Sequence, residues 1–253
     1  MQTSLDCPSR ALAQCWREPP NEEPLPLSVV IPVFNEVGNL TVLVEEIYAA
    51  LTTVHRFEVV IVDDASTDGS TDEIAALCRT DDCVRAFSHS HNRGQSAALS
   101  TGIRGARGRI IATLDGDGQN DPADIPDMLA LLSIHSRNVL IAGERLRRQD
   151  KWLRRLSSRI ANHVRSTVLK DGTRDTGCGL KVFFRDAYLS LPEFDHMHRF
   201  LPALFVRHGG VVVTVPVNHR PRRQGVSKYG IANRLWVGII DLLGVWWLQH
   251  RRL

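Results

Sequence analysis

The chain has 253 residues, of which 43% are hydrophobic and 23% are charged, and both values are ordinary for a soluble globular protein. Collagen-like, coiled-coil and wholly disordered chains are therefore excluded, and the length suits one α/β domain or two smaller domains. The 31 Lys and Arg residues against 28 Asp and Glu residues give a net charge of +3, which by itself gives no reason to propose nucleic acid as a partner.

The first 26 residues contain five prolines and six Asp, Glu or Arg residues, and they lack the apolar run of a signal peptide. We interpret residues 1–26 as a flexible Pro-rich tail. The five cysteines include no CxxC pair, which indicates a reduced, cytoplasmic compartment rather than a disulfide scaffold.

From residue 27 onward, short apolar runs alternate with helical patterns. The pattern predicts strands at 27–33, 57–62, 84–88, 109–114 and 139–142, and helices near 40–51, 71–79, 95–106 and 122–133. Continuous apolar strands separated by helices are typical of a parallel sheet that is covered on both faces. The expected fold class is therefore α/β, with a Rossmann-like, mostly parallel sheet.

Three of the predicted strands end in polar residues, namely Asn35-Glu36, Asp63-Asp64 and Asp115-Gly116-Asp117. In open α/β sheets, ligands bind beyond the carboxyl ends of the strands. A helix cap or a turn explains any one of these groups equally well. Together, however, carboxylates that converge on one crevice repel each other unless a cation joins them.

The sharpest motif is Asp115-Gly116-Asp117-Gly118-Gln119, which lies between a predicted strand and a helix start. Two carboxylates separated by one glycine can offer oxygen ligands to a divalent cation. Such a cation would offset the charge of a diphosphate leaving group. The motifs GxGxxG and GxxxxGK[ST] are absent, which argues against dinucleotide-binding and P-loop proteins.

Residues 145–170 contain nine Lys or Arg residues and one acidic residue, and they predict a basic amphipathic helix. Its apolar positions at helical spacing are Leu153, Leu156, Ile160, Val164 and Val168. An anionic membrane surface and the protein core are equally good partners for this stripe.

The apolar run at 235–248 is interrupted by Asp241 and is too short for the ~20 residues of a membrane-spanning helix. Its tryptophans and the arginines that follow favour the membrane interface, while a buried core or dimer helix is the alternative. We expect residues 229–253 to form an amphipathic, monotopic membrane helix, and we expect no transmembrane helix in the chain.

The motif at 31–36, the motif Val62-Asp63-Asp64-Ala65-Ser66-Thr67-Asp68-Gly69-Ser70 and the DGDGQ stretch together resemble the inverting glycosyltransferase family two, which has the GT-A fold. Three further segments, at 143–145, 175–181 and 222–228, resemble its dolichol-phosphate mannosyltransferase-like branch. The resemblance covers about residues 27–248. It implies a catalytic domain at 27–228, which includes the basic segment at 145–170.

The resemblance also implies roles for single residues. The expected nucleotide-sugar contacts are Pro32, Phe34, Glu36, Val62, Asp64, Asp115, Gly116, Asp117, Arg145, Arg222 and Lys228. The expected ligands of Mg²⁺ or Mn²⁺ are Asp115, Asp117 and Gln119, and the expected catalytic residues are Asp115, Asp117 and Arg145. The acceptor region is assigned to Asp175, Lys181 and Ser227. Phe34 stands where Tyr is commoner, which keeps the ring and removes a hydroxyl.

The implied reaction moves a hexose, by default mannose, from GDP-mannose or a UDP-hexose to dolichol or undecaprenyl phosphate. It would take place at the cytoplasmic face of the membrane, where the protein is peripheral. A phosphate monoester has a second pKa of about 6, so the acceptor is mostly a dianion and needs cationic positioning more than a strong base. The expected partners are the donor, the lipid and the membrane surface, with no nucleic acid. The sequence leaves open whether the protein also binds a membrane protein or forms a homo-oligomer.

Three alternatives remain. A family-two enzyme with a sugar or lipid hydroxyl as acceptor would need a base, for which Asp175 is the candidate. A nucleotidyltransferase also combines a nucleotide crevice with acidic metal ligands, and a non-enzymatic binder could use the basic segment at 145–170.

The pairs His89-x-His91 and His196-x-His198 lack further ligands nearby in sequence, so we interpret them as loop and surface histidines rather than a zinc site.

Overall fold

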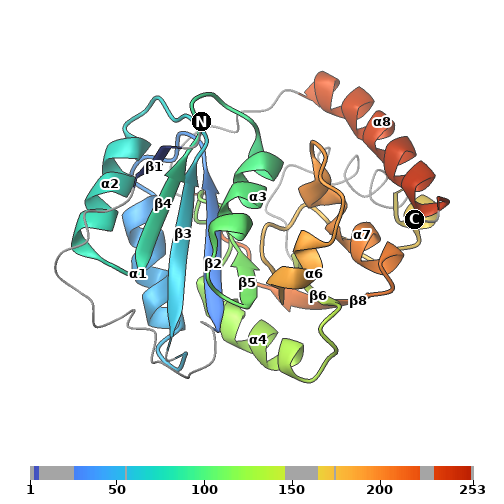
Figure 1. Cartoon of the computed structure of the whole chain (residues 1–253), viewed down its shortest axis with the longest axis horizontal. Helices are drawn as coiled ribbons and strands as arrows, with labels where there is room; N and C mark the ends of the chain where they lie inside the picture. Colours follow the sequence, from blue (N-terminus) through green and yellow to red (C-terminus); the bar gives the residue numbers. More distant parts are fainter. Residues whose placement is uncertain are drawn as a thin grey trace.

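The computed structural model describes residues 3–5, 26–54, 56–145, 165–173, 175–222 and 231–251, which form an eight-stranded sheet with helices on both faces (Figure 1). The strands are β1 Thr3–Leu5, β2 Leu27–Val33, β3 Phe57–Asp63, β4 Val84–Ser88, β5 Ile110–Thr113, β6 Val139–Arg145, β7 Lys181–Phe184 and β8 Val211–Val217. The α-helices are α1 Leu40–Ala50, α2 Ser70–Thr80, α3 Gln95–Gly105, α4 Ile125–Ser133, α6 Arg185–Leu189, α7 Leu201–Arg207 and α8 Ile231–Gln249. The described residues also include the 3₁₀ turns η1 Pro122–Asp124 and η2 Met197–Arg199, and residues 165–169 are helical.

The strand order is β1-β4-β3-β2-β5-β7-β6-β8. The central strands β4, β3, β2 and β5 run parallel, whereas β7 is antiparallel to both of its neighbours, β5 and β6. In the register of β2 and β3, Val33 pairs with Asp63, so these two strands end at the same level. Residues that follow the parallel strands are thereby brought to one edge of the sheet.

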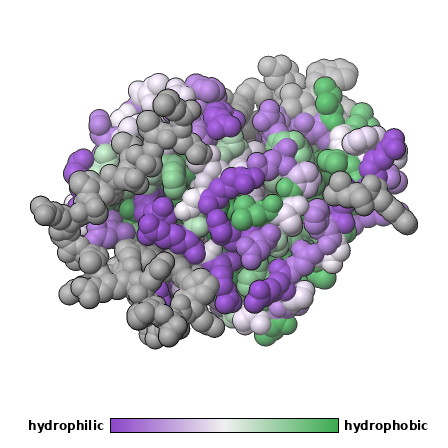
Figure 2. Space-filling model, in the orientation of Figure 1, coloured by the Kyte–Doolittle hydropathy of each residue, from purple (hydrophilic) through white to green (hydrophobic). Residues whose placement is uncertain are grey.

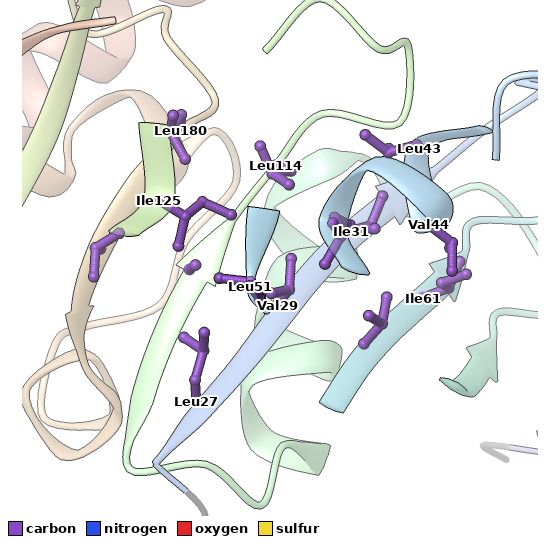
Figure 3. Close-up of a cluster of buried hydrophobic side chains, with 14 of the residues drawn as sticks. Leu27, Val29, Ile31, Leu43, Val44, Leu51, Ile61, Leu114, Ile125 and Leu180 are labelled. Atoms are coloured by element: carbon purple, nitrogen blue, oxygen red, sulfur yellow. The ribbon is translucent and has the colours of Figure 1, made fainter. Parts of the chain in front are cut away.

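The two faces of the sheet bury separate hydrophobic clusters because successive residues of a strand point to opposite sides. On β2, Val29 and Ile31 face a cluster with residues of α1, α2 and α4, part of which is drawn in Figure 3. Val30 faces the other cluster, which contains residues of α3, α6 and α7. On that face, α3 packs closely, since a Cβ at Gly102 would lie 2.5 Å from Val30 Cγ1.

The predicted alternation of strands and helices is confirmed up to residue 145, as is the mostly parallel sheet covered on both faces. The differences there are small, the largest being β6, which extends three residues beyond the predicted 142. Strands β7 and β8 were not predicted from the sequence. Strand β1 pairs with the edge of β4 and lies inside the segment that the sequence predicts as a tail.

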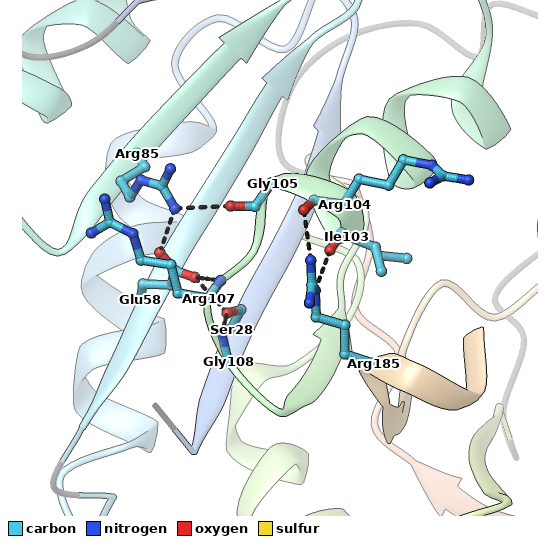
Figure 4. A network of polar contacts seen from close by, with 9 residues as sticks. All are labelled: Ser28, Glu58, Arg85, Ile103, Arg104, Gly105, Arg107, Gly108 and Arg185. Carbon is cyan, nitrogen blue, oxygen red and sulfur yellow. Dashed lines mark hydrogen bonds and ion pairs between the residues drawn. The ribbon is translucent and has the colours of Figure 1, made fainter. Parts of the chain in front are cut away.

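A buried network fixes the amino ends of the strands, opposite to the edge where β2, β3 and β5 end (Figure 4). The fully buried carboxylate of Glu58 accepts hydrogen bonds from Ser28 Oγ (2.6 Å), Arg107 N (2.6 Å) and Arg85 Nη1 (3.0 Å). Arg85 Nη1 also donates to the carbonyl of Gly105 at the end of α3. The Arg85 guanidinium thus donates to a carbonyl at the C-terminal end of α3, where its positive charge interacts favourably with the negative end of the helix dipole.

Replacing Glu58 with Ala is expected to destabilise the fold by about 2–4 kcal/mol, because the buried hydroxyl of Ser28, the main-chain N–H of Arg107 and the charge of Arg85 all lose their partner. Urea unfolding measures the change. The matched control is Glu193→Ala, which breaks an exposed pair with Arg104 and is expected to cost less than about 1 kcal/mol. Equal costs for the two variants would contradict the prediction.

Helix α8 docks on the domain through one side and exposes the other. Val245 is buried with Leu169, Phe200 and Ala203, and Asp241 Oδ2 lies 3.0 Å from His196 Nδ1. Among the side chains of α8 that the structure describes, the exposed large hydrophobic ones are Ile240, Leu243, Trp246 and Trp247. Figure 2 shows hydrophobic residues at the end of the molecule where α8 lies. Among the described residues, no helix is both long and apolar enough to cross a membrane.

Candidate functional site

The candidate site lies where the parallel strands β2, β3 and β5 end. Glu36 follows β2, Asp64 follows β3, and Asp115 and Asp117 follow β5. Arg145 is the last residue of β6, which lies farther along the same sheet. The predicted convergence of these strand ends is confirmed by the sheet order and by the contacts described below.

The loops after β2 and β3 are joined by hydrogen bonds. Asn35 N donates to Ser66 Oγ (2.9 Å), Glu36 N donates to Ser70 Oγ (2.8 Å), and Thr67 N donates to Asn35 Oδ1 (2.6 Å). Asn35 has a φ of 55°, a left-handed conformation that Asn tolerates better than most residues. A large part of the motif at 62–70 therefore serves to shape the loop that follows β2.

Asp64 organises the loop that leads into α3. Its buried carboxylate accepts hydrogen bonds from Arg93 N (2.8 Å) and Gly94 N (2.7 Å), and its Oδ1 lies 2.6 Å from His89 Nδ1. The other ring nitrogen of His89 lies 2.9 Å from Thr101 Oγ1. His89 lies in the loop after β4, as predicted, but it is not a surface residue, because its ring is buried in a polar contact with Asp64.

Asp115 and Asp117 form a pair of largely buried carboxylates. Burial and the negative charge of Asp117 raise the pKa of Asp115 to about 6, although Lys181 and Arg145 act in the opposite direction. Gln95 Nε2 donates a hydrogen bond to Asp115 Oδ1 at 2.8 Å. At pH 7 the pair therefore carries negative charge that its surroundings only partly balance.

This pair suits a divalent cation such as Mg²⁺ or Mn²⁺, because such a cation would remove the repulsion that raises the pKa of Asp115. Within the described ranges, no three His, Cys, Asp or Glu side chains gather closely enough to hold a metal ion. Two carboxylates are nevertheless enough where a substrate phosphate supplies further oxygens, as is usual for Mg²⁺. The predicted ligand Gln119 points its amide nitrogen toward the carbonyl of Arg220, at 3.4 Å.

The segment after β8 brings a cation to this pair. Arg222 Nη2 lies 2.7 Å from Asp117 Oδ2, and its Nη1 lies 3.9 Å from Glu36 Oε1. The position of the segment is fixed by Arg220, which forms ion pairs with Glu46 (2.8 Å) and Asp121 (2.7 Å). Three predicted site residues, Glu36, Asp117 and Arg222, are therefore neighbours in space.

A second cationic group, which consists of Arg145 and Lys181, acts on Asp115 through its charge. Arg145 and Asp175 form a two-bond ion pair, with Nε–Oδ2 at 2.7 Å and Nη2–Oδ1 at 2.8 Å. Lys181 is buried at the start of β7 and donates to the carbonyl of Cys178. Burial lowers the pKa of Lys181, while the charges of Cys178, Asp115 and Asp175 raise it. Lys181 thus acts on Asp115 from a buried position through its charge.

The remaining predicted residues differ in how they can take part. The side chain of Val62 is buried in the cluster beneath α3, so a nucleotide contact at this position would have to come from its main chain. Pro32 and Phe34 are partly exposed. A Cβ at Gly116 would lie 3.3 Å from the carbonyl oxygen of Pro32, which leaves little room for a larger residue. Ser227 and Lys228 lie outside the described residues.

Most of the predicted basic segment at 145–170 also lies outside the described residues. Of its apolar stripe, Val168 is described, and it packs on the cluster that contains Leu169 and Val245. Arg165 is buried in an ion pair with Asp171. The C-terminal end of the segment, at residues 165–170, therefore packs against the rest of the domain.

Gln95 and Arg220 were not predicted from the sequence, and the structure joins both to predicted site residues. Gln95 follows β4 and begins α3, so the rule that ligand sites lie beyond strand ends could have identified it. Arg220 gives no comparable signal, because its partners Glu46 and Asp121 are distant in sequence.

Proteins of known function are similar to this chain in sequence. The model of the family described as glycosyl transferase family 2 matches residues 28–191. A dodecaprenyl-phosphate galacturonate synthase of Rhizobium johnstonii is 38% identical over 228 residues, which cover 87% of this chain and 66% of that protein. An undecaprenyl-phosphate 4-deoxy-4-formamido-L-arabinose transferase of Shewanella sediminis is 36% identical and is matched over 86% of this chain and 65% of its own length. The chain thus spans just under two thirds of these relatives.

Solved structures show the same fold. Glucosyl-3-phosphoglycerate synthase of Mycobacterium tuberculosis, in complex with Mn²⁺, UDP and phosphoglyceric acid, aligns with a TM-score of 0.66 at 17% identity, over 89% of this chain and 78% of that one. A mannosyltransferase of Pyrobaculum calidifontis in complex with GDP-Man and Mn²⁺ aligns with a TM-score of 0.60 at 23% identity, over 81% of this chain and 59% of that one. The expected GT-A fold is confirmed.

Proposed function

The chain belongs to glycosyl transferase family 2, and we propose that it transfers a sugar from a UDP-linked donor to a polyprenyl phosphate at a membrane surface. The observation that carries this proposal is the arrangement of charge at the strand ends. Arg222 contacts one member of the Asp115–Asp117 pair, and Arg145 and Lys181 act on the other. Such a site can bring two phosphate-bearing substrates together against their mutual repulsion.

The relatives support a polyprenyl phosphate as the acceptor and a sugar other than mannose. Their names specify dodecaprenyl or undecaprenyl phosphate, with galacturonate or 4-deoxy-4-formamido-L-arabinose as the sugar. Because a structural relative, glucosyl-3-phosphoglycerate synthase, is in complex with UDP, we propose a UDP-linked uronic acid or modified pentose as the donor, in place of the default mannose. GDP-mannose stays as the comparison donor, because one structural relative is in complex with GDP-Man.

Each cationic group of the site has a distinct part in the proposed transfer. Arg222 lies beside Asp117 and Glu36, where it would bind the donor. Arg145 and Lys181 would attract the acceptor phosphate, which acts as the nucleophile without a strong base because it is mostly a dianion at pH 7. A divalent cation held by Asp115 and Asp117 would supply Lewis-acid stabilisation of the leaving diphosphate.

Asp175 bears on the choice between a phosphate and a hydroxyl acceptor. A hydroxyl acceptor would require a free carboxylate as base, for which Asp175 was the candidate. Both carboxylate oxygens of Asp175 accept hydrogen bonds from Arg145. This arrangement favours a role for Asp175 in holding Arg145 in place, and it supports the phosphate acceptor.

A transfer assay tests the proposed function. Purified protein is incubated with Mn²⁺, a panel of radiolabelled UDP-sugars or GDP-mannose, and either undecaprenyl phosphate or undecaprenol in detergent. We expect label from a UDP-sugar to enter the lipid fraction with undecaprenyl phosphate and not with undecaprenol. Asp117→Asn serves as the inactive control. Label found only in water, or on undecaprenol, would overturn the acceptor assignment.

We also propose that the exposed side of α8 binds the membrane. Its residues Ile240, Leu243, Trp246 and Trp247 are exposed, and Arg251 lies over the Trp247 ring at 5.3 Å from its centroid. Aromatic residues beside a basic end are typical of helices that lie in the interface of an anionic bilayer. The cytoplasmic face is proposed because the five cysteines of the sequence include no CxxC pair, which is typical of a reduced compartment.

Replacing Trp246 and Trp247 together with Ser is expected to reduce binding to phosphatidylglycerol-containing vesicles at least ~10-fold, because two large apolar side chains no longer enter the bilayer. Vesicle sedimentation measures the change. The control is Ile134→Ser, which removes an exposed apolar side chain at the end of α4 and should leave binding unchanged. Equal losses in both variants would contradict a specific role for α8.

A further inference from the structure

Gln95 has no assigned role, yet it touches the centre of the site. It is the first residue of α3, and its side-chain amide donates to Asp115 Oδ1 at 2.8 Å. Within the described part of the chain, it is the hydrogen-bond donor to this carboxylate. The backbone of Gly179 also lies against Asp115, since a Cβ there would come within 2.3 Å of the carboxylate carbon. The carboxylate thus contacts both the Gln95 amide and Gly179.

The start of α3 is held in place on two sides. Before Gln95, the main-chain N–H groups of Arg93 and Gly94 both donate to Asp64. After it, Ser96 Oγ lies 2.7 Å from His198 Nδ1 and accepts a hydrogen bond from His198 N at 3.2 Å. Neither contact involves the Gln95 side chain. The backbone position of Gln95 is therefore set independently of Asp115.

The chemical character of this donor matters for a carboxylate that holds a cation. A direct hydrogen bond from Arg or Lys would fix Asp115 but would also neutralise the charge that attracts the cation. A neutral amide fixes one oxygen and leaves the negative charge in place. Arg145 and Lys181 influence Asp115 through their charge, while the hydrogen bond comes from the neutral Gln95. Outer partners of this kind orient metal ligands in other sites.

We propose that Gln95 is a positioning residue, which holds the Asp115 carboxylate in the orientation that binds the divalent cation together with the donor diphosphate. This inference rests on the proposed function, because it assumes that Asp115 and Asp117 hold a cation. It differs from that function in assigning a role to α3, whose first turn carries none of the predicted site residues.

The test compares Gln95→Met, which keeps the length of the side chain but removes the N–H donor, with the parent protein. Titration calorimetry with Mn²⁺ in the presence of UDP measures the affinity, and Mn²⁺ electron paramagnetic resonance reports the coordination. We expect Mn²⁺ to bind ~10–100-fold more weakly to Gln95→Met, as for the loss of a hydrogen bond to a charged group. In transfer assays, the Mn²⁺ concentration needed for half-maximal rate should rise by a similar factor.

Two comparisons separate this role from a general structural one. Arg104→Gln alters an exposed pair on the same helix and should leave Mn²⁺ affinity within twofold of the parent. Thermal unfolding of Gln95→Met without Mn²⁺ should stay close to that of the parent. If the parent binds Mn²⁺ and UDP and Gln95→Met binds them equally well, the role of Gln95 is overturned while the proposed function stands. If the parent binds neither, both are overturned.

Discussion

Asp115→Asn is expected to stabilise the unliganded protein at pH 7 by about 1–3 kcal/mol and to reduce sugar transfer at least ~100-fold. The pKa of Asp115 is raised to about 6, mainly by burial and next by Asp117, from its ordinary value of 3.8. The folded state therefore binds this proton more tightly than the unfolded state, and the stability of the parent falls as pH rises from about 4 to 6. Asn has nearly the same shape as Asp but stays uncharged, so the variant avoids the free-energy cost of a buried negative charge at this position.

Thermal unfolding at pH 4 and pH 7.5 measures the stability effect. The gain in the variant should be present at pH 7.5 and absent at pH 4, where Asp115 is protonated in the folded parent. Addition of Mn²⁺ with UDP should raise the unfolding temperature of the parent and leave that of the variant almost unchanged. A variant that is less stable than the parent at pH 7.5 would show that the charge of Asp115 is better compensated than its burial indicates.

Gly179→Ala is expected to reduce transfer ~100-fold while the protein still folds. The added Cβ would lie 2.3 Å from Asp115 Cγ and Oδ2, so the carboxylate must move. Gln95 already lies against the other oxygen, and a displacement of about 1 Å at a reacting centre can cost a factor of that size. The overpacking itself should cost about 1–3 kcal/mol of stability.

The rate of transfer and the affinity for Mn²⁺ with UDP measure this effect. Gly244→Ala on α8 is the matched control, because a Cβ there meets no atom within 4 Å and alanine favours a helix. Its transfer rate should equal that of the parent. Normal activity in Gly179→Ala would mean that Asp115 has space to reorient, and it would weaken the assignment of Asp115 as a fixed ligand.

The sequence was most informative where structure is local. Each parallel strand from β2 to β5 is a short apolar run bounded by turn residues, and each following helix has its own apolar period, so the pattern of nearby residues is sufficient. Strand β7 was missed because its role depends on distant partners. It inserts antiparallel between β5 and β6, and nothing in its four residues indicates that direction.

The same distinction between local patterns and contacts of distant residues applies to the candidate site. Asp115 and Asp117 could be found from the sequence because a strand end followed by two carboxylates is a local pattern with a chemical meaning. The burial of His89, the hydrogen bond from Gln95 and the pairing of Arg145 with Asp175 could not be found in this way. Each of these contacts joins residues 20 to 30 positions apart along the chain.

By itself, the sequence determined the α/β class, the family and the acidic pair after β5, because these follow from residue types at fixed short spacings. The tertiary structure alone decided which cation meets which carboxylate, so that Arg222 lies on Asp117 and Arg145 on Asp175. Charges interact through space, and the distance between two side chains is set by the packing of whole strands and helices. A motif specifies the groups that can react, while the fold determines their partners.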